Sequence, residues 1–362
     1  MKILVAGDWH SELHEEAVAY ALETLGHVVA RFSWNGYFIA AGNSFIARLF
    51  GLWLRTQNKY LWGGRIAQLN NDLVNLAKRT QPDAVLIYRG THVLAETLRH
   101  LREAVPGVVL VGYNNDDPFA PGHVIGLWRH FIAGLPELDL ALAYRHANLQ
   151  DFRRAGARRV ELLRSWYIPA RNHPVELSES ERTQFGCDVV FIGHYEPDMR
   201  LSCLEEVVKR GWHLRLFGHD DGWGQALASS RLLRRYSPVS TVWGGDYNRA
   251  LNGARVALCF LSKLNRDTYT RRCFEIPASG AMLLSEYSED LAGMFLPGVE
   301  ADFFTSVEEF GEKLSRYLRD DALRQRVADA GRARLVRDRH DVVSRMHDTM
   351  HWVGEIKIQN EQ

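Results

Sequence analysis

The 362-residue sequence is poor in the features that mark several protein classes. It has only four cysteines, at positions 187, 203, 259 and 273, and no two of them form a CxxC pair. This spacing argues against a zinc site and a disulfide framework, and it is typical of proteins from a reducing cytoplasm. The 44 Lys and Arg residues equal the 44 Asp and Glu residues, so no global basic field is available and we expect no nucleic-acid partner.

Long hydrophobic runs are also scarce. The N-terminal stretch "MKILVAGDWH" enters an expected strand at once, and its apolar run is too short for a signal peptide. The most hydrophobic region, residues 37–55, contains Asn43, Ser44 and Arg48 and is a poor transmembrane span. We expect an amphipathic helix packed on its own domain there, with weak contact to a membrane or a lipid-linked substrate as the alternative. The expected location is the cytoplasm, with the inner face of the membrane as a variant of it.

The residues that are present form an ordinary soluble composition, 46% hydrophobic and 24% charged. A chain of this length exceeds the size at which one hydrophobic core usually keeps growing, so two domains are expected. Two prolines and a polar cluster interrupt the pattern over residues 168–182. We therefore predict an N-terminal domain over 1–170, a linker over 171–186 and a C-terminal domain over 187–340. A final helix over 341–362 follows, and its return to the N-terminal domain is one option.

Both halves of the chain alternate apolar strands with amphipathic helices. The expected strands lie at residues 2–7, 27–32, 83–90, 108–116, 138–144, 187–194, 213–220, 255–262 and 280–286. Continuous apolar strands separated by helices indicate parallel sheets that are covered on both faces. The first helix should have Ser11 as its N-cap and Gly26 at its C-terminal end. The predicted fold class is α/β, with two doubly wound, Rossmann-like domains facing a cleft.

The first expected strand ends in "GDWHSELHE", where Asp8 and His10 follow a glycine. Ligands of open parallel sheets bind beyond the carboxyl ends of the strands, so we predict catalytic roles for both side chains. His10 is the preferred base because imidazole groups titrate near neutral pH. A helix-capping role for Asp8 remains the alternative. The segment has no GxGxxG pattern and does not resemble a dinucleotide site.

A second strand end in the first half reads "YNNDDPF" and places Asp116 and Asp117 before a proline. Asp before Pro is a common turn signal, and a turn can also present a carboxylate as a general base. Both aspartates are therefore candidate catalytic residues.

The second half offers an anion site at two strand ends. "FIGHYEPDMR" contains Gly193, which lets a phosphate approach the backbone, and Arg200, whose guanidinium can bind it. "TYTRRCFE" predicts a helix that begins near residues 268–270 with a threonine cap and two arginines. Such a helix start attracts anions, and Glu275 one turn later could accept hydrogen bonds from a ribose diol. Surface positions for these arginines, with an ion pair to Glu275, are the alternative.

The stretch "EIPASG" resembles the donor-binding segment of retaining glycosyltransferases of the GT-B fold. More specifically, the chain resembles the spore maturation protein CgeB family of glycosyltransferases. The similar patterns are T-x-R-x-F-E-I-P-A-x-G at residue 270 onward, F-x-x-G-x-E-A-x-F-F-x-S-x-E-E at residues 295–309, and the A-x-x-G before the final helix. The likeness spans nearly the whole chain and is strongest over residues 188–345.

This resemblance implies a nucleotide-sugar site in the second domain. Glu275 would contact the ribose, and Arg272 with Arg200 would bind the diphosphate. Gly193, Thr270 and Arg271 would belong to the same site. GT-B enzymes often carry a glutamate eight positions before the ribose glutamate, where this chain has Asp267. The shorter side chain leaves its contact with the sugar open.

Together the residues and the resemblance predict a cytoplasmic glycosyltransferase of the hexosyltransferase type. The donor would be a UDP- or dTDP-linked sugar, and the acceptor a glycan, a lipid-linked molecule or a protein. We expect no further cofactor and no metal, because "HDD" at residues 219–221 does not form a ligand set. The likeness around "EIPASG" favours retention over inversion. The alternatives are a nucleotide-sugar epimerase of the same fold and a binding protein without turnover.

Overall fold

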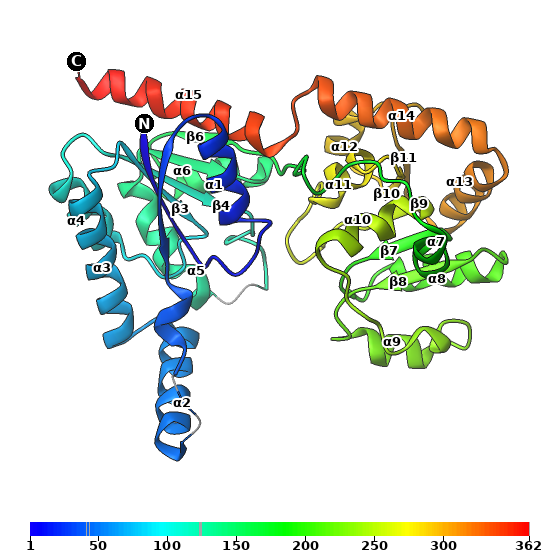
Figure 1. Cartoon of the computed structure of the whole chain (residues 1–362), viewed down its shortest axis with the longest axis horizontal. Helices are drawn as coiled ribbons and strands as arrows, with labels where there is room; N and C mark the ends of the chain where they lie inside the picture. The colour runs from blue at the N-terminus through cyan, green and yellow to red at the C-terminus, as the bar shows by residue number, and fades with distance from the viewer. Residues whose placement is uncertain (41, 43, 123–124, 362) are drawn as a thin grey trace. The chain divides into compact units, whose positions relative to one another are not determined.

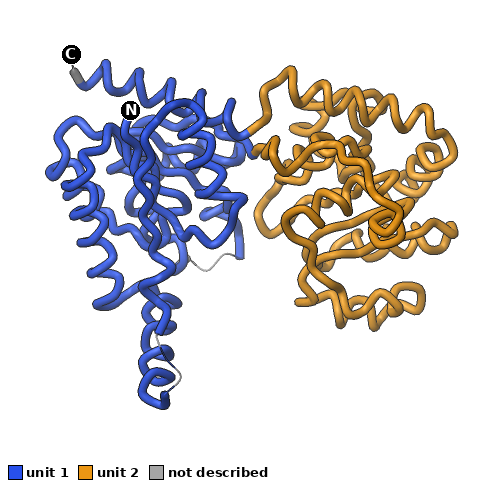
Figure 2. The backbone as a smooth tube through the Cα atoms, in the orientation of Figure 1, with its two compact units in different colours: residues 1–165, 342–362 blue, residues 166–341 orange. Residues whose placement is uncertain are grey.

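The computed structural model describes residues 1–40, 42, 44–122 and 125–361. The chain divides into two compact units, which Figure 2 shows in different colours. Unit 1 comprises Met1–Ser165 and Val342–Gln362, and unit 2 comprises Trp166–Asp341. Each unit is built around a parallel β-sheet with helices on its faces (Figure 1).

Unit 1 contains a sheet with the strand order β2-β1-β3-β4-β5-β6. The strands are β1 (Lys2–Gly7), β2 (Val28–Ser33), β3 (Ala84–Tyr88), β4 (Val109–Asn114), β5 (Leu140–Ala143) and β6 (Val160–Leu162). The helices are α1 (Glu15–Thr24), η1 (Asn35–Phe38), α2 (Phe45–Tyr60), α3 (Gly64–Thr80), α4 (Ala95–Ala104), α5 (Ile125–Gly134), η2 (Leu135–Glu137), α6 (His146–Arg154) and α15 (Val342–Glu361). The strands β3, β4 and β5 are buried along their whole length, which explains their continuous apolar sequences.

Unit 2 contains a second parallel sheet, with the order β11-β10-β9-β7-β8. Its strands are β7 (Cys187–Ile192), β8 (Leu214–Phe217), β9 (Ala254–Cys259), β10 (Met282–Glu286) and β11 (Asp302–Phe304). Its helices are α7 (Glu179–Phe185), α8 (Arg200–Lys209), α9 (Trp223–Ser229), η3 (Arg234–Tyr236), α10 (Gly244–Asn252), α11 (Arg272–Ala278), α12 (Glu289–Met294), α13 (Val307–Arg319) and α14 (Asp321–Arg337). The predicted α/β class with two parallel-sheet domains is confirmed.

The division of the chain differs from the expected boundaries at the junction of the two domains, and the last helix follows the option that the sequence left open. Residues 171–186, expected as a linker, lie in unit 2 and contain α7. That helix begins with a capping box, in which the side chains of Ser178 and Glu181 bond each other's backbone N–H groups. The last helix, α15, belongs to unit 1, where Arg159 binds Glu355 at 2.8 Å and Lys357 binds Asp83.

The predicted N-cap of the first helix is wrong. Helix α1 begins at Glu15, and the hydroxyl of Ser11 instead accepts a hydrogen bond from the backbone N–H of Leu13 at 3.2 Å. Gly26 does lie just beyond the C-terminal end of α1, with φ of 81°. A left-handed residue at this point ends a helix, and glycine adopts the conformation without strain.

The hydrophobic region 37–55 contains the end of η1 and most of α2. Asn43, which the sequence analysis noted, lies outside the described residues, as does residue 41. Helix α2 begins after Ser44, whose hydroxyl accepts a hydrogen bond from the N–H of Ala47 at 3.1 Å. Among the described residues, no helix is both long and apolar enough to cross a membrane.

Candidate functional site

In unit 2, the carboxyl end of β7 lies against the side chain of Arg272. A Cβ atom at Gly193 would lie 3.2 Å from Nη2 of Arg272 and 2.8 Å from Cζ of Phe191. Glycine is therefore required for the guanidinium to approach the backbone this closely. The structure thus brings together two residues that were predicted to bind the donor.

Arg272 is a partly buried cation. Burial alone would lower its pKa, but the neighbouring Tyr247, Cys259 and Glu275 outweigh burial and raise it, so the side chain stays charged. Within the part of the chain that the structure describes, no hydrogen bond or ion pair joins its guanidinium to an acceptor. A desolvated charge without a partner is costly, and such a group at the end of a parallel strand is suited to an anionic ligand.

Glu275 lies on the same helix as Arg272 and is 4% exposed. Its Oε2 accepts a hydrogen bond from the hydroxyl of Tyr247 at 2.7 Å. Burial and the charge of Glu275 raise the pKa of Tyr247 well above its usual range, so the phenol remains a donor. Tyr247 holds one carboxylate oxygen, and Oε1 has no hydrogen-bond partner among the described residues. No sequence motif marked Tyr247, because it comes from α10 and meets Glu275 only in the fold.

The other residues of the "TYTRRCFE" stretch have different environments. Helix α11 begins at Arg272, and its N-cap, Arg271, makes no side-chain cap hydrogen bond, so the predicted threonine cap is wrong. The hydroxyl of Thr270 instead lies 3.3 Å from Sγ of Cys259. The guanidinium of Arg271 lies 5.4 Å from the centroid of the Trp166 ring. Asp267 is half-buried in the loop before α11, where its N–H donates to the carbonyl of Ser262.

Arg200 is the first residue of α8 and is 2% exposed. Its guanidinium binds both carboxylate oxygens of Asp198 at 2.8 Å and donates to the carbonyl of His194 at 2.7 Å. These bonds fix the loop that follows Gly193. Because the donors are engaged within the protein, the geometry favours a positioning role for Arg200, and its contact with a diphosphate stays a prediction.

In unit 1, Asp8 and His10 form a pair at the end of β1. Oδ2 of Asp8 lies 2.9 Å from Nδ1 of His10, and the His10 side chain is 47% exposed. A carboxylate on Nδ1 orients the ring and leaves Nε2 for a ligand. The buried Glu15, which the sequence analysis did not single out, accepts the N–H of Asp8 at 2.8 Å. Burial raises the pKa of Glu15, and its carboxylate occupies the space that a side chain on Gly7 would need.

The two aspartates of "YNNDDPF" differ in access. Asp116 binds Arg89 at 2.6 Å and remains partly exposed. Asp117 is fully buried, and its Oδ1 accepts bonds from the N–H of Phe119 at 3.0 Å and the amide of Asn148 at 2.7 Å. A buried carboxylate whose oxygen is occupied in this way shapes the turn. This environment favours a structural role for Asp117, and its role as a general base stays a prediction.

A cavity of about 330 Å³ lies at this end of the unit 1 sheet. It is lined by Asp8, Trp34, Arg55, Asn58, Lys59, Leu61, Arg89, Thr91, His92 and Leu127. The cavity size is that of a small-molecule site, and its lining is rich in polar and basic groups. Its lining residues come from the segments after β1, β2 and β3 and from α2 and α5, so no single stretch of sequence could reveal it.

No group of three or more His, Cys, Asp or Glu side chains in the described residues is arranged to hold a metal ion. The "HDD" stretch forms an exposed loop after β8, in which Oδ1 of Asp220 accepts the N–H of Val239 at 3.1 Å. The ring of His219 lies 6.2 Å from that of the exposed Trp243.

Comparisons with known proteins agree with this architecture. A family model described as glycosyl transferase-like matches residues 200–351. The structure of HepE from Anabaena in complex with UDP and glucose is similar over 98% of this chain and 100% of its own, with a TM-score of 0.67 and 12% identity. The chain has the GT-B fold. Two other similar structures also cover nearly all of this chain and nearly all of their own chains.

These two GT-B structures come from other bacteria. Sucrose-phosphate synthase from Thermosynechococcus elongatus matches with a TM-score of 0.67 and 11% identity, over 98% of this chain and 99% of its own. Trehalose 6-phosphate synthase from Burkholderia multivorans matches with a TM-score of 0.65 and 13% identity, over 99% of this chain and 97% of its own. A search of curated protein sequences gives no match.

Proposed function

We propose that this protein is a glycosyltransferase that moves a sugar from a nucleoside-diphosphate donor to a hydroxyl acceptor. The observation that carries the proposal is the cluster around Arg272: a charged guanidinium without an ion-pair partner in the described residues, resting on Gly193 and one turn from Glu275. Similar structures have been solved with UDP and with UDP-glucose, which supports a UDP-linked donor.

In this proposal, the residues of unit 2 bind the donor. Arg272 neutralises charge on the diphosphate, which increases as the glycosidic bond of the donor breaks. Oε1 of Glu275 accepts a hydrogen bond from the ribose, while Tyr247 holds the other oxygen in place. Thr270, Arg271 and Asp267 shape the loop that carries Arg272, and Arg200 fixes the loop after Gly193. No metal is required in this scheme, because the guanidinium supplies the positive charge.

The acceptor binds in the cavity of unit 1. The basic and hydroxyl groups of its lining suit a polar acceptor such as a sugar, and Asp8 lies on its wall. A separate cavity for a second substrate supports a transferase over an epimerase or a binding protein. We infer that transfer proceeds with retention, and that His10 and Asp8 orient the acceptor hydroxyl. Asp116 contributes by holding Arg89, which also lines the cavity.

The finer assignment rests on the sequence motifs. The patterns at residues 270–286 and 295–309 support placement among the CgeB-like glycosyltransferases of the hexosyltransferase type. A cytoplasmic location is consistent with the cysteine content.

Calorimetric titration with UDP tests the donor site. The Arg272→Ala variant should lose about 1.5–3 kcal/mol of binding free energy, the usual value of a hydrogen bond to a charged group. The Glu275→Gln variant should lose its preference for UDP over 2′-deoxy-UDP, because one acceptor becomes a donor. Arg326→Ala, an exposed arginine on α14 of the same unit, is the matched control and should bind as wild type does. Unchanged UDP affinity in Arg272→Ala would remove the basis of the proposal.

A further inference from the structure

Helix α2 projects from the rest of unit 1 (Figure 1). Many of its apolar side chains are exposed and together form a large apolar surface. We call this surface the apolar face of α2, and it consists of Phe45, Ile46, Leu49, Phe50, Leu52 and Trp53. The exposed fractions of Ile46, Leu49 and Trp53 are 78%, 54% and 48%. Six neighbouring exposed apolar side chains exceed what scattered surface residues would explain, and such patches mark interaction sites.

The charge of this region has one sign. No Asp or Glu occurs between Glu23 and Asp72, whereas the same interval contains five basic residues, Arg31, Arg48, Arg55, Lys59 and Arg65. The whole chain has equal numbers of acidic and basic residues, so this interval is a local exception. A partner of this surface must therefore accept apolar side chains and carry negative charge.

The helical spacing places the apolar residues on one side of α2 and the basic residues along the edge of that side. Ile46, Leu49, Phe50 and Trp53 follow the i, i+3, i+4, i+7 pattern and share one side of α2. Arg48, Arg55 and Lys59 follow i, i+7, i+11, which places them in a single column along the edge of the apolar face, and all three are exposed. An apolar face bordered by cations is the pattern of helices that lie in the interface of a lipid bilayer.

The C-terminal end of α2 is fixed to the rest of unit 1. Asn58 bonds the ring of His92 at 2.7 Å, and the carbonyl of Leu61 accepts from Arg129 at 2.7 Å and from His130 at 2.9 Å. Leu54 and Gln57, in the C-terminal half of the helix, are buried. The fold thus holds α2 firmly at one end while its apolar face remains accessible.

We propose that the apolar face of α2 docks on the surface of an anionic lipid bilayer, with the basic column against the lipid headgroups. The exposed aromatic residues Trp53, Tyr60 and Trp62 suit the boundary between acyl chains and headgroups. Burial of apolar area and attraction to anionic lipids then act together. The proposal does not depend on transferase activity.

A second copy of this chain fits the surface less well. A two-fold dimer through α2 would place the same patch on both partners, so the basic column would face other basic residues with no acidic residue of this interval to pair with it. An anionic bilayer satisfies both the apolar side chains and the charge.

Vesicle cosedimentation of the full-length protein tests the proposal. The protein should sediment with vesicles of equimolar phosphatidylcholine and phosphatidylglycerol, and far less with phosphatidylcholine alone. Removing two cations, in Arg48→Gln/Arg55→Gln, should lower the partition coefficient by about thirtyfold. Ile46→Ser/Leu49→Ser should reduce binding to background. Both pairs are exposed, so urea unfolding should show the same stability as wild type.

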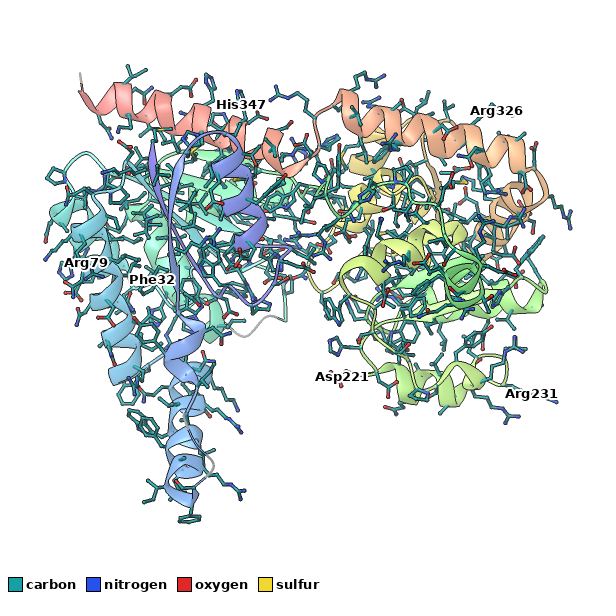
Figure 3. All side chains as sticks on the ribbon, viewed as in Figure 1. Phe32, Arg79, Asp221, Arg231, Arg326 and His347 are labelled. Carbon is teal, nitrogen blue, oxygen red and sulfur yellow. The ribbon has the colours of Figure 1, made fainter. Side chains whose placement is uncertain are left out.

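The matched control is Arg231→Gln/Arg326→Gln, which removes two charges from the outside of unit 2 (Figure 3) and should bind vesicles as wild type does. The proposal is overturned if wild type fails to bind the anionic vesicles, if it binds both vesicle types equally, or if the α2 variants bind as wild type does. Self-association of wild type that Ile46→Ser/Leu49→Ser abolishes, without vesicle binding, would assign the face to a second copy instead. UDP affinity, measured in parallel, tests the donor site separately.

Discussion

Replacing Gly193 by alanine tests whether packing at the end of β7 sets the position of Arg272. The new Cβ would lie 2.8 Å from Cζ of Phe191 and 3.2 Å from Nη2 of Arg272. The Phe191 ring cannot retreat easily, because the rings of Phe260 and Trp223 lie 5.1 and 6.0 Å from it. The guanidinium is the end of a flexible side chain and should move away instead. Overpacking of this kind costs about 1–3 kcal/mol of stability.

The displacement of Arg272 should also weaken the binding of UDP. Loss of one bond between the guanidinium and the diphosphate removes about 1.5–3 kcal/mol, which corresponds to at least a tenfold weaker affinity for UDP. Urea unfolding measures the first effect, and calorimetric titration with UDP measures the second. Both should change in Gly193→Ala.

Gly293→Ala is the matched control for this prediction. Gly293 lies in α12 of the same unit, and a Cβ there would have no neighbour within 4 Å. Because alanine is the better helix former, this variant should be about 0.5–1 kcal/mol more stable and bind UDP as wild type does. If Gly193→Ala binds UDP with wild-type affinity, the close approach of Arg272 to residue 193 has no role in donor binding, and our reasoning about the site is refuted.

Two further predictions concern unit 1. Burial and the nearby charges of His130 and Arg89 lower the pKa of His92 to about 4. The unfolded chain therefore binds a proton at higher pH than the folded chain does. As a result, the stability of the protein falls as the pH drops from about 6.5 toward 4. Between pH 7 and pH 4.5, the loss of stability measured by urea unfolding should be roughly 2–3 kcal/mol smaller in His92→Asn than in wild type. An equal loss in the two proteins would contradict the low pKa of His92. His10→Ala should slow transfer by about one to two orders of magnitude and leave UDP affinity unchanged if the enzyme retains configuration. Inversion at the anomeric carbon, observed by NMR together with an inactive His10→Ala variant, would instead identify His10 as the general base.

The sheets could be predicted from the sequence because their signal is local. A buried parallel strand such as β3 or β4 needs an apolar residue at every position, so a short window of sequence contains all the information. The start of a helix depends on contacts as well as on its own residues. Ser11 had the right residue type for a cap, but the carboxylate of Glu15 turns back to the N–H of Asp8, and α1 begins there.

The candidate donor site could be predicted in part, because some of its residues are close together in the sequence. Arg272 and Glu275 are three positions apart, so one helical turn brings them to the same side and a short motif can mark them. The contacts of Arg200 within the protein could not be predicted in this way. A guanidinium two residues from an aspartate can face solvent or turn back, and here it is buried against Asp198. Tyr247 was missed because only the packing of α10 brings it to Glu275.

The cavity of unit 1 could not be predicted from short stretches of sequence. Asp8, Arg55 and His92 line one cavity, although they lie more than thirty residues apart in the sequence and belong to three different segments. Helix α2 links this cavity to the exposed surface, because the basic column that borders its apolar face includes Arg55 and Lys59, which also line the cavity. A bilayer that binds α2 would therefore lie next to the place where the proposed acceptor enters. Among the acceptors that the sequence left open, this geometry favours a lipid-linked molecule over a soluble glycan or a protein.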